Sequence, residues 1–315
     1  MKKIVVIGGG HGQSTILKGI KEIEDVAISA IVTVADDGGS TGRIRSLYNI
    51  PAMGDIRNVL LALRTKDNFI SDLLAYRFSS ALYSDDFDII GHNLGNLMMT
   101  ALTDTEGSFL KAITTLKEAL GVKAEIIPSS LDIITLYAKM DDDTIVKGEA
   151  NIPSYNHHIK KVFYDKEPEA TDSAIKAILD ADLLVYGIGS VYTSIIPNII
   201  IPKIKEAIAK TKAYKVYFAN CMTQNNETFD YDLKDHVEAM MEHGAKIDLV
   251  VKHDDVIPSA IKERYLLENS IEVIDHHDLD IEVMPYDLLD FSRNLVRHDP
   301  YKIKAVTEKI IKERL

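Results

Sequence analysis

The sequence contains almost no cysteine: Cys221 is the single one in 315 residues. One cysteine cannot close an internal disulfide or supply a zinc site built from several thiolates. A chain of this length buries a large core without such cross-links. A reducing compartment is the default for such a protein, and we expect it to be cytoplasmic.

Long apolar runs are also missing. The first run, Ile4–Ile7, ends at a triplet of glycines. No run elsewhere approaches the roughly 18 residues that a membrane-spanning helix requires. A secretory signal would need a longer apolar stretch than the one at the N-terminus. The sequence therefore predicts neither insertion into a membrane nor export.

The chain has fewer basic than acidic residues. The chain has 36 lysines and arginines against 48 aspartates and glutamates, which gives a formal net charge of −12. Such a surface repels phosphate backbones at long range, so we expect no general binding to nucleic acid or to an anionic membrane. A small basic pocket for one nucleotide remains compatible with this charge. The composition, 46% hydrophobic and 27% charged, is otherwise that of a globular protein.

Short β-branched runs alternate with amphipathic stretches along the chain. Runs typical of strands occupy 3–7, 28–35, 123–127, 133–140, 144–150, 183–186, 215–219, 247–251 and 271–273. Helical periodicity covers 13–23, 54–64, 69–83, 93–102, 108–120, 175–179 and 302–314. This alternation favours right-handed crossovers between parallel strands. We predict a Rossmann-like α/β fold, a mostly parallel sheet with helices on both faces.

The length corresponds to one or two domains of about 150 residues each. No linker rich in proline, glycine or serine interrupts the chain, and we predict a single α/β domain over 1–315. The stretch 123–168 is richer in alternating strands and in Asp, Lys and Asn. It would form a smaller antiparallel insertion or edge. A sheet of this kind often dimerises, so a homodimer is compatible with the sequence, although no apolar stripe identifies an interface.

The first candidate site is the glycine turn after the first strand, which comprises Gly8, Gly9, Gly10 and Gly12. Glycines let the backbone approach a ligand, and the following helix offers free N–H groups to a phosphate. Gln13 occupies the place of the third glycine of a dinucleotide fingerprint, and no Walker Gly-Lys-Ser/Thr follows. A turn that only joins strand to helix is the alternative. His11 within the turn either faces the ligand or packs.

A pair of carboxylates, Asp36 and Asp37, follows the second predicted strand. Ligands bind beyond the carboxyl ends of parallel strands, where adjacent acids suit a divalent metal or a ribose hydroxyl. The alternative is an exposed turn that favours Asp and Gly. Arg43 and Arg45 are candidate partners for a phosphate, unless they are solvated.

Two further motifs begin helices. Asp55 and Asn58 belong to the first, where Asp55 either caps the helix or contacts a ligand. Asn93 and Asn96 belong to the second, and their amides suit recognition of a base or a hydroxyl. Close helix packing at Gly95 is the alternative for the second motif.

Polar turns also follow two later strands. The first contains Gly189 and Ser190, and the second contains Asn220, Thr223 and Gln224. Ser190 is not in the Gly-x-Ser-x-Gly elbow of a hydrolase. Several such turns at one edge of a sheet predict a long groove for a nucleotide and a group attached to it.

Other reactive residue types are interpreted as structural. Cys221 is favoured as a small buried hydrophobe rather than a nucleophile. The pairs His157–His158 and His276–His277 lack the i,i+4 spacing of helical metal ligands. We expect them to lie on the surface or to pack.

The order of these motifs resembles that of a known family. The matching segments are Gly8–Gly12, Val32–Ser40, Gly54–Asn58, Gly91–Asn96, Gly187–Ser194 and Met222–Gln224. Together they are similar to the YvcK proteins, the putative gluconeogenesis factors of the CofD-like superfamily. The likeness extends from about residue 1 to Arg297–Asp299. His11 and Gln13 depart from the threonine and leucine usual in that family.

This resemblance implies a bacterial factor for cell shape and wall synthesis on gluconeogenic carbon sources. It implies binding of UDP-N-acetylglucosamine across Gly8–Gly12, Asp36–Asp37 and Asn220–Gln224. Tyr265 and Arg297 fall where that family has a ring and a guanidinium for its UDP-sugar. A tyrosine can stack on uracil, and an arginine can hold a pyrophosphate. Such a regulator would need no cofactor and would act through an unidentified protein partner.

The related CofD branch implies an alternative function. Those enzymes transfer a phospholactyl group from a nucleotide diphosphate donor, with a divalent metal at an Asp after the second strand. Asp36 and Asp37 match those acids, and Asp37 is the candidate ligand for Mg²⁺ if this chain is a transferase. The segments Asp36–Arg43 and Gly54–Asn58 follow the YvcK pattern instead, which favours a binding protein.

Overall fold

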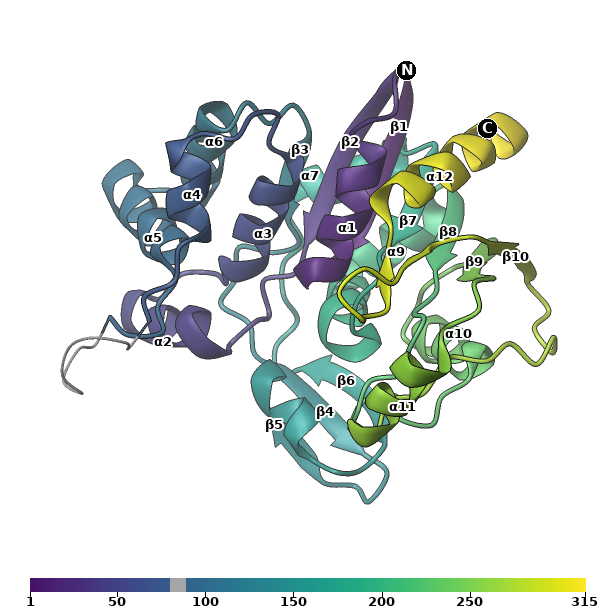
Figure 1. Cartoon of the computed structure of the whole chain (residues 1–315). Coiled ribbons are helices and arrows are strands. Elements are labelled where there is room, and N and C mark those ends of the chain that lie inside the picture. The colour runs from purple at the N-terminus through teal and green to yellow at the C-terminus, as the bar shows by residue number, and fades with distance from the viewer. Residues whose placement is uncertain (80–88) are drawn as a thin grey trace.

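A seven-stranded parallel sheet forms the centre of the computed structural model, which describes residues 1–79 and 89–315 (Figure 1). Its order is β10-β9-β8-β7-β1-β2-β3. These strands are β1 (Lys2–Gly8), β2 (Val26–Val32), β3 (Glu125–Pro128), β7 (Leu183–Tyr186), β8 (Tyr214–Phe218), β9 (Leu249–His253) and β10 (Glu282–Tyr286). Every adjacent pair is parallel, which confirms the predicted fold class. Chain order reverses between β1 and β7, so the sheet has its topological switch point there.

Helices cover both faces of this sheet. They are α1 (Gly10–Ile20), α2 (Gly39–Tyr48), α3 (Gly54–Leu63), α4 (Phe69–Ala75), α5 (Leu94–Glu106), α6 (Phe109–Ala119), α7 (Asp172–Asp180), α8 (Ile196–Ile199), α9 (Pro202–Lys210), α10 (Leu233–Glu242), α11 (Ser259–Leu267) and α12 (Pro300–Arg314). Helix α1 packs with α3 and α12, whereas α7 packs with α9 on the other side (Figure 1). In the described ranges, none of these helices is long and apolar enough to cross a bilayer.

Burial on both faces explains the composition of the central strands. Ile4, Val6 and Ile7 of β1 are completely buried, and so is all of β7. The β-branched side chains fill both layers between the sheet and the helices. The sequences of these strands are therefore continuous apolar runs. The packed core therefore holds the carboxyl ends of β1 and β7 rigidly side by side.

A smaller antiparallel sheet lies beyond the carboxyl edge of the parallel one (Figure 1). Its order is β5-β4-β6, formed by β4 (Leu136–Met140), β5 (Ile145–Lys147) and β6 (Ile159–Tyr164). It falls inside the stretch 123–168, for which an antiparallel insertion or edge was predicted, and residues 141–143 join β4 to β5 in a hairpin. The short helix η1 (Glu149–Ser154) connects β5 to β6.

Some predicted elements were wrong. The helix predicted over 69–83 ends at Ala75, and Arg77 instead bridges to Asn93; residues 80–88 of that prediction lie outside the described residues. The segment 271–273 forms only an isolated bridge, from Glu272 to Met222. The last strand of the sheet is β10, which was not predicted. None of its five residues is buried, so this edge strand lacks the apolar run that marks the central strands.

Helix α12 closes the fold by packing across α1 at Gly19. A Cβ on Gly19 would stand 2.3 Å from the carbonyl oxygen of Pro300 and 3.2 Å from the nitrogen of Lys304. Backbone atoms cannot move aside as a side chain can. The absence of a side chain at Gly19 is therefore what allows the two helices to approach so closely.

We predict that Gly19→Ala lowers the free energy of unfolding by about 1–3 kcal/mol, because the added methyl must push α12 away from α1. Urea denaturation measures this change. Lys18→Ala on the exposed side of the same helix is the control, with an expected effect within about 0.5 kcal/mol. Equal stability of the two variants would contradict the close approach.

Candidate functional site

A cleft of about 520 Å³ opens at the carboxyl ends of β1, β7 and β8. It lies at the topological switch point, where open α/β sheets bind their ligands. Eleven of the predicted site residues line it: Gly9, Gly10, His11, Gly12, Gly189, Ser190, Asn220, Thr223, Gln224, Tyr265 and Arg297. The fold thus brings together residues that are far apart in the sequence.

The glycine turn after β1 forms one wall of the cleft. Gly10 has a φ of +61°, which favours glycine, and it starts α1. A Cβ on Gly12 would lie 1.7 Å from the carbonyl oxygen of Ile188, so this turn packs directly on the turn after β7. The first N–H groups of α1 therefore border the cleft, as in phosphate-binding turns.

Gln13 explains why the third glycine is absent. Its side chain is fully buried, and its amide nitrogen donates to the carbonyl oxygens of Val6 at 3.0 Å and Ile31 at 2.8 Å. The amide thereby ties β1 to β2 beneath the turn. In dinucleotide-binding folds, a glycine at this position lets the helix pack closely on the strand. In this chain a buried, hydrogen-bonded glutamine occupies that position.

Hydrogen bonds from polar side chains stabilise the turn after β7. Ser190 caps the following helix by accepting from the N–H of Thr193 at 3.2 Å, and its own hydroxyl donates to the buried carboxylate of Glu227. Asn220 donates to the carbonyl oxygen of Gly189 at 2.9 Å. Both polar side chains are engaged in hydrogen bonds that shape the cleft wall.

The segment after β8 forms the floor. Burial raises the pKa of the Cys221 thiol to about 12, so this cysteine is packed and unreactive, as interpreted from the sequence. Thr223 is buried, and its hydroxyl accepts from the N–H of Ile271 at 2.9 Å. Gln224 differs: its buried side-chain oxygen has no hydrogen-bond partner among the described residues. The side-chain oxygens of Gln13 and Asn198 share this property, but of the three residues only Gln224 lines the cleft.

Tyr265 and Arg297 form the rim opposite the glycine turn. The hydroxyl of Tyr265, on α11, accepts from the N–H of Val296 at 3.1 Å and so holds the segment that carries Arg297. Partial burial, followed by the charges of Arg297, Arg57 and Lys18, lowers the pKa of His11. Arginine and lysine side chains thus lie near His11, despite the negative charge of the whole chain.

Carboxylates gather beside the Gly10 end of the cleft. The Oδ2 of Asp55 lies 2.6 Å from where a Cβ of Gly9 would stand, and Asp55 accepts a hydrogen bond from the backbone of Gly10. Asp55 therefore faces the glycine turn, and its predicted capping role is wrong, since Met53 occupies the N-cap of α3. Burial and the charge of Asp36 raise the pKa of Asp55 to about 7.

Glu149, which the sequence analysis missed, belongs to the same acidic group. Burial and then the charges of Asp36, Asp55, Glu227 and Asp37 raise its pKa to about 8. It accepts no hydrogen bond from residues 1–79 or 89–315. The antiparallel elaboration brings it there, because η1 follows β5 directly. No helical or strand motif in the sequence marks Glu149, so only the fold could identify it.

Asp36 and Asp37 follow β2 as predicted, outside the cleft itself. Asp36 accepts from the N–H of Gly38 at 2.9 Å, and Asp37 accepts from the N–H of Ala150 at 2.9 Å. These hydrogen bonds use one oxygen of each carboxylate. No three of these acids bring ligand atoms within 4.8 Å of one another. Carboxylate oxygens are the donor type that Mg²⁺ prefers, but these acids form no closed ligand cluster in the described part of the chain.

The predicted asparagines pack away from the cleft. Asn96 is buried, accepts from Arg57 Nη1 at 2.6 Å, and donates to the hydroxyl of Ser40 at 3.2 Å. Asn93 caps α5 by accepting from the N–H of Asn96 at 3.2 Å. Asn58 accepts from Arg57 Nη2 at 2.8 Å. These amides position the Arg57 guanidinium rather than line the cleft.

The two predicted phosphate-binding arginines also lie outside the cleft. Arg43 donates to the carbonyl oxygen of Ile90 at 2.8 Å. Arg45 is buried, and its guanidinium donates to the carbonyl oxygens of Ala35, Asp36 and Ile134. Arg45 thus ties the end of β2 to the segment before β4, which is a structural role.

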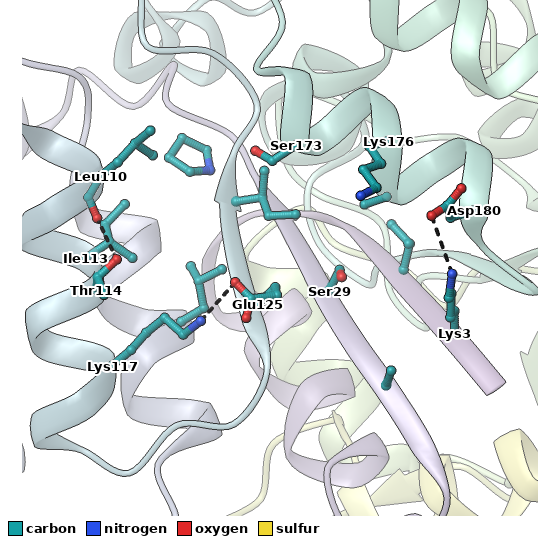
Figure 2. A pocket seen from close by; sticks show the side chains of 16 residues that line it. Lys3, Ser29, Leu110, Ile113, Thr114, Lys117, Glu125, Ser173, Lys176 and Asp180 are labelled. Carbon is teal, nitrogen blue, oxygen red and sulfur yellow. Dashed lines mark hydrogen bonds and ion pairs between the residues drawn. The ribbon is translucent and has the colours of Figure 1, made fainter. Parts of the chain in front are cut away.

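A second hollow, of about 410 Å³, lies at the opposite end of the sheet, between α6 and α7 (Figure 2). Two of its three lysines are engaged in ion pairs, Lys117 with Glu125 at 2.9 Å and Lys3 with Asp180 at 3.4 Å. Its floor is apolar, and it contains none of the predicted site residues. The cleft at the switch point has more polar groups directed at one space and is the better candidate site.

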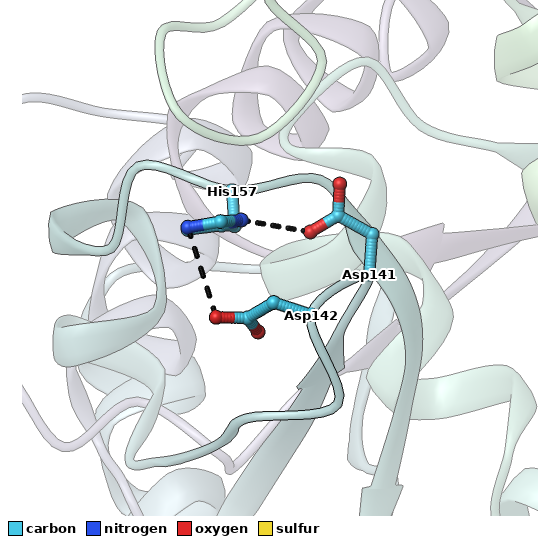
Figure 3. A group of neighbouring side chains, drawn as sticks. All are labelled: Asp141, Asp142 and His157. Carbon is cyan, nitrogen blue, oxygen red and sulfur yellow. Dashed lines mark hydrogen bonds and ion pairs between the residues drawn. The ribbon is translucent and has the colours of Figure 1, made fainter.

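A histidine and two aspartates meet at the tip of the β4–β5 hairpin (Figure 3). His157 lies 2.9 Å from Asp141 and 3.7 Å from Asp142. Asp142 already accepts from the N–H and hydroxyl of Thr144 and from the hydroxyl of Tyr155. We therefore interpret this exposed group as a closure of the hairpin. His158 packs on Phe229 with ring centroids 4.7 Å apart.

The family model described as 2-phospho-L-lactate transferase CofD matches residues 4–289, so the chain belongs to the CofD family. Within it, the chain groups with the gluconeogenesis factors. It is 39% identical to the gluconeogenesis factor of Bacillus subtilis, covering 99% of this chain and 98% of the relative. It is 40% identical to the putative gluconeogenesis factor of Aquifex aeolicus, covering 100% and 99%. A crystal structure of a UPF0052 family member from Bacillus halodurans has a TM-score of 0.91 at 38% identity, covering 97% and 99%.

We predict that Glu149→Gln stabilises the fold at high pH. The folded chain holds the Glu149 proton up to about pH 8, whereas the unfolded chain releases it near 4.5. Stability from this group is present below 4.5 and lost as the pH rises through about 8. Glutamine keeps the neutral form, so the free energy of unfolding should rise by about 1–3 kcal/mol at high pH and change little near pH 4.

Urea denaturation across this pH range measures the difference. The exposed Glu167→Gln is the matched control, and its effect should not follow the same pH profile. A gain from Glu149→Gln that is equal at both ends of the range would show that this carboxyl is not buried among like charges.

Proposed function

We propose that the chain is a regulatory protein that binds a nucleotide sugar, UDP-N-acetylglucosamine, in the cleft at the switch point. The observation that carries this proposal is the pairing of a glycine turn at a helix N-terminus with the Tyr265–Arg297 rim across the same cleft. A ligand with a diphosphate between two ring systems suits both walls. The link from gluconeogenic carbon to wall synthesis and cell shape, implied by the resemblance, is part of this proposal.

The diphosphate would lie against the glycine turn. The first N–H groups of α1 and its positive dipole end favour an anion there. His11 and Arg297 border the same space, and Arg297 can hold phosphate oxygens in a bidentate manner. Gly10 leaves no side chain between the backbone and the ligand, whereas the absence of a side chain at Gly12 makes room for the turn after β7.

The uracil would lie between the floor and the Tyr265 ring. Uracil N3–H is a donor, and Gln224, which lines the cleft, has a side-chain oxygen without a partner among the described residues. Stacking on a tyrosine ring suits a flat base.

A binding role is favoured over catalysis in this cleft. Cys221 keeps its proton, and Ser190 does not lie in the Gly-x-Ser-x-Gly elbow of a hydrolase. Such a regulator would need no cofactor and would act in the cytoplasm through a protein partner, with a homodimer as a further possibility.

The acidic group beside Gly10 supports a second candidate, a metal-dependent transferase of the phospholactate type. Burial and, after it, neighbouring carboxylates raise the pKa values of Asp55 and Glu149, so negative charge is concentrated there. Mg²⁺ held by Asp37 and its neighbours would supply the positive charge that a transferring diphosphate requires. The chain's own acids would then place that ion at the glycine turn.

We predict that UDP-N-acetylglucosamine raises the melting temperature without Mg²⁺, by roughly 2.7 kcal/mol of stability at a hundredfold excess over Kd. Arg297→Gln should weaken binding about tenfold or more, because a charge-assisted contact is lost. Arg293→Gln, an exposed arginine outside the cleft, is the matched control. Thermal shift and calorimetry measure both.

Two outcomes would contradict this proposal. Absence of any shift with UDP-sugars would remove the nucleotide-sugar ligand. A shift with guanosine nucleotides that requires Mg²⁺, together with release of product from such a donor, would favour the transferase.

We also predict that UDP-sugar affinity increases as the pH falls through the range where His11 titrates. Burial and neighbouring cations lower its pKa in the free protein. A bound diphosphate raises that pKa, so binding takes up a proton and is stronger at lower pH. Calorimetry in buffers of different ionisation enthalpy measures the uptake. His11→Asn should abolish it, and uptake that persists in this variant would exclude His11 as its source.

A further inference from the structure

The outer face of the small antiparallel sheet is basic, although the chain carries a net charge of −12. Its side chains, here called the lysine face, form two rows across the three strands. The first row is Lys147, Tyr137 and Phe163, and the second is Ile145, Lys139 and Lys161. Directly paired residues of antiparallel strands point to the same side. The opposite side, with Leu136, Ala138 and Val162, is buried in the core.

Two aromatic rings organise this face. Tyr137 and Phe163 stack with centroids 5.6 Å apart and planes 23° apart. The Nζ of Lys147 lies 5.9 Å from the Tyr137 centroid, and the Nζ of Lys161 lies 5.7 Å from the Phe163 centroid. Cation–π contacts therefore hold both ammonium groups near a fixed position. Side chains ordered in advance lose less entropy when they bind.

The lysines of this face differ in what they can still bind. Lys139 is paired with Asp143 at 2.7 Å. Lys147 and Lys161 are exposed, and neither forms an ion pair within residues 1–79 and 89–315. The two ammonium groups at either side of the stacked rings are thus available to an anion.

The aromatic stack also discriminates between anionic partners. A nucleobase would need a free ring face, but Tyr137 and Phe163 cover each other and the lysines lie over the rings. Ammonium groups held at separate points suit carboxylates carried along an extended segment. We propose that the lysine face docks an acidic, carboxylate-rich segment of a partner protein.

The lysine face lies next to the acidic group that contains Asp37 and Glu149. Lys147 is followed by Gly148, where a Cβ would lie 2.8 Å from Asp37 Oδ2, and then by Glu149. The N–H of Ala150 donates to Asp37, so the segment after Lys147 is anchored at the candidate site. A partner on the lysine face would touch the strand that positions Glu149. The docking itself rests on the lysine face and is independent of the nucleotide-sugar proposal.

The experiment measures fluorescence anisotropy of a labelled polyglutamate peptide with the full chain at low ionic strength. We expect binding that added salt weakens, because exposed charges are screened. Lys147→Gln with Lys161→Gln should raise Kd about tenfold. Lys66→Gln with Lys312→Gln, exposed lysines on other elements, is the matched control and should leave Kd unchanged. Arginine at both positions should retain binding, and equal melting temperatures verify folding.

The proposal is overturned if polyglutamate does not bind, or binds equally to the two double glutamine variants. Polyglutamine of the same length should not bind. Oligo-dT and phosphatidylserine vesicles are tested in parallel. If either binds more tightly than polyglutamate and loses binding in the Lys147/Lys161 variant, a nucleic acid or a membrane occupies this face instead. UDP-N-acetylglucosamine binding is measured separately, so failure of one proposal is distinguishable from failure of the other.

Discussion

The contact between the turn after β1 and the turn after β7 is the constraint on which the site depends. Gly12 has no side chain, and a Cβ there would overlap the carbonyl of Ile188. Because the two backbones touch, the start of α1, the turn at Gly189 and the Asn220 amide border one space. Any side chain at Gly12 would separate these strand ends and open the cleft.

Buried amide side chains hold this junction together. Gln13 joins β1 to β2, and Asn198 donates to the carbonyl oxygens of Gly8 at 3.1 Å and Ser194 at 2.9 Å. Strand ends leave carbonyl groups unpaired, and a buried unpaired carbonyl is costly. Amides can satisfy several of them at once without adding charge. The electrostatics of the cleft are therefore left to the helix N-terminus, His11 and Arg297.

Positive and negative side chains occupy different parts of the site. The glycine turn and its rim are positive, whereas Asp55 and Glu149 form a negative region with raised pKa values at the Gly10 end. Burial strengthens both fields because the surrounding dielectric is low. The small antiparallel sheet contributes Glu149 to this arrangement and presents its lysines on the other side. The small antiparallel sheet is thus part of the site.

The sequence by itself determined the α/β class and the cleft-lining turns. Apolar runs that end in glycine, as at Ile7 and Tyr186, require a buried strand followed by a tight turn, and parallel strands bring such turns to one edge. It did not determine which polar residues point inward. Asn96 serves packing and Glu149 faces the acids, because burial and the path of the β4–β6 insertion set their environment. Those roles depend on distant contacts, which only the tertiary structure decided.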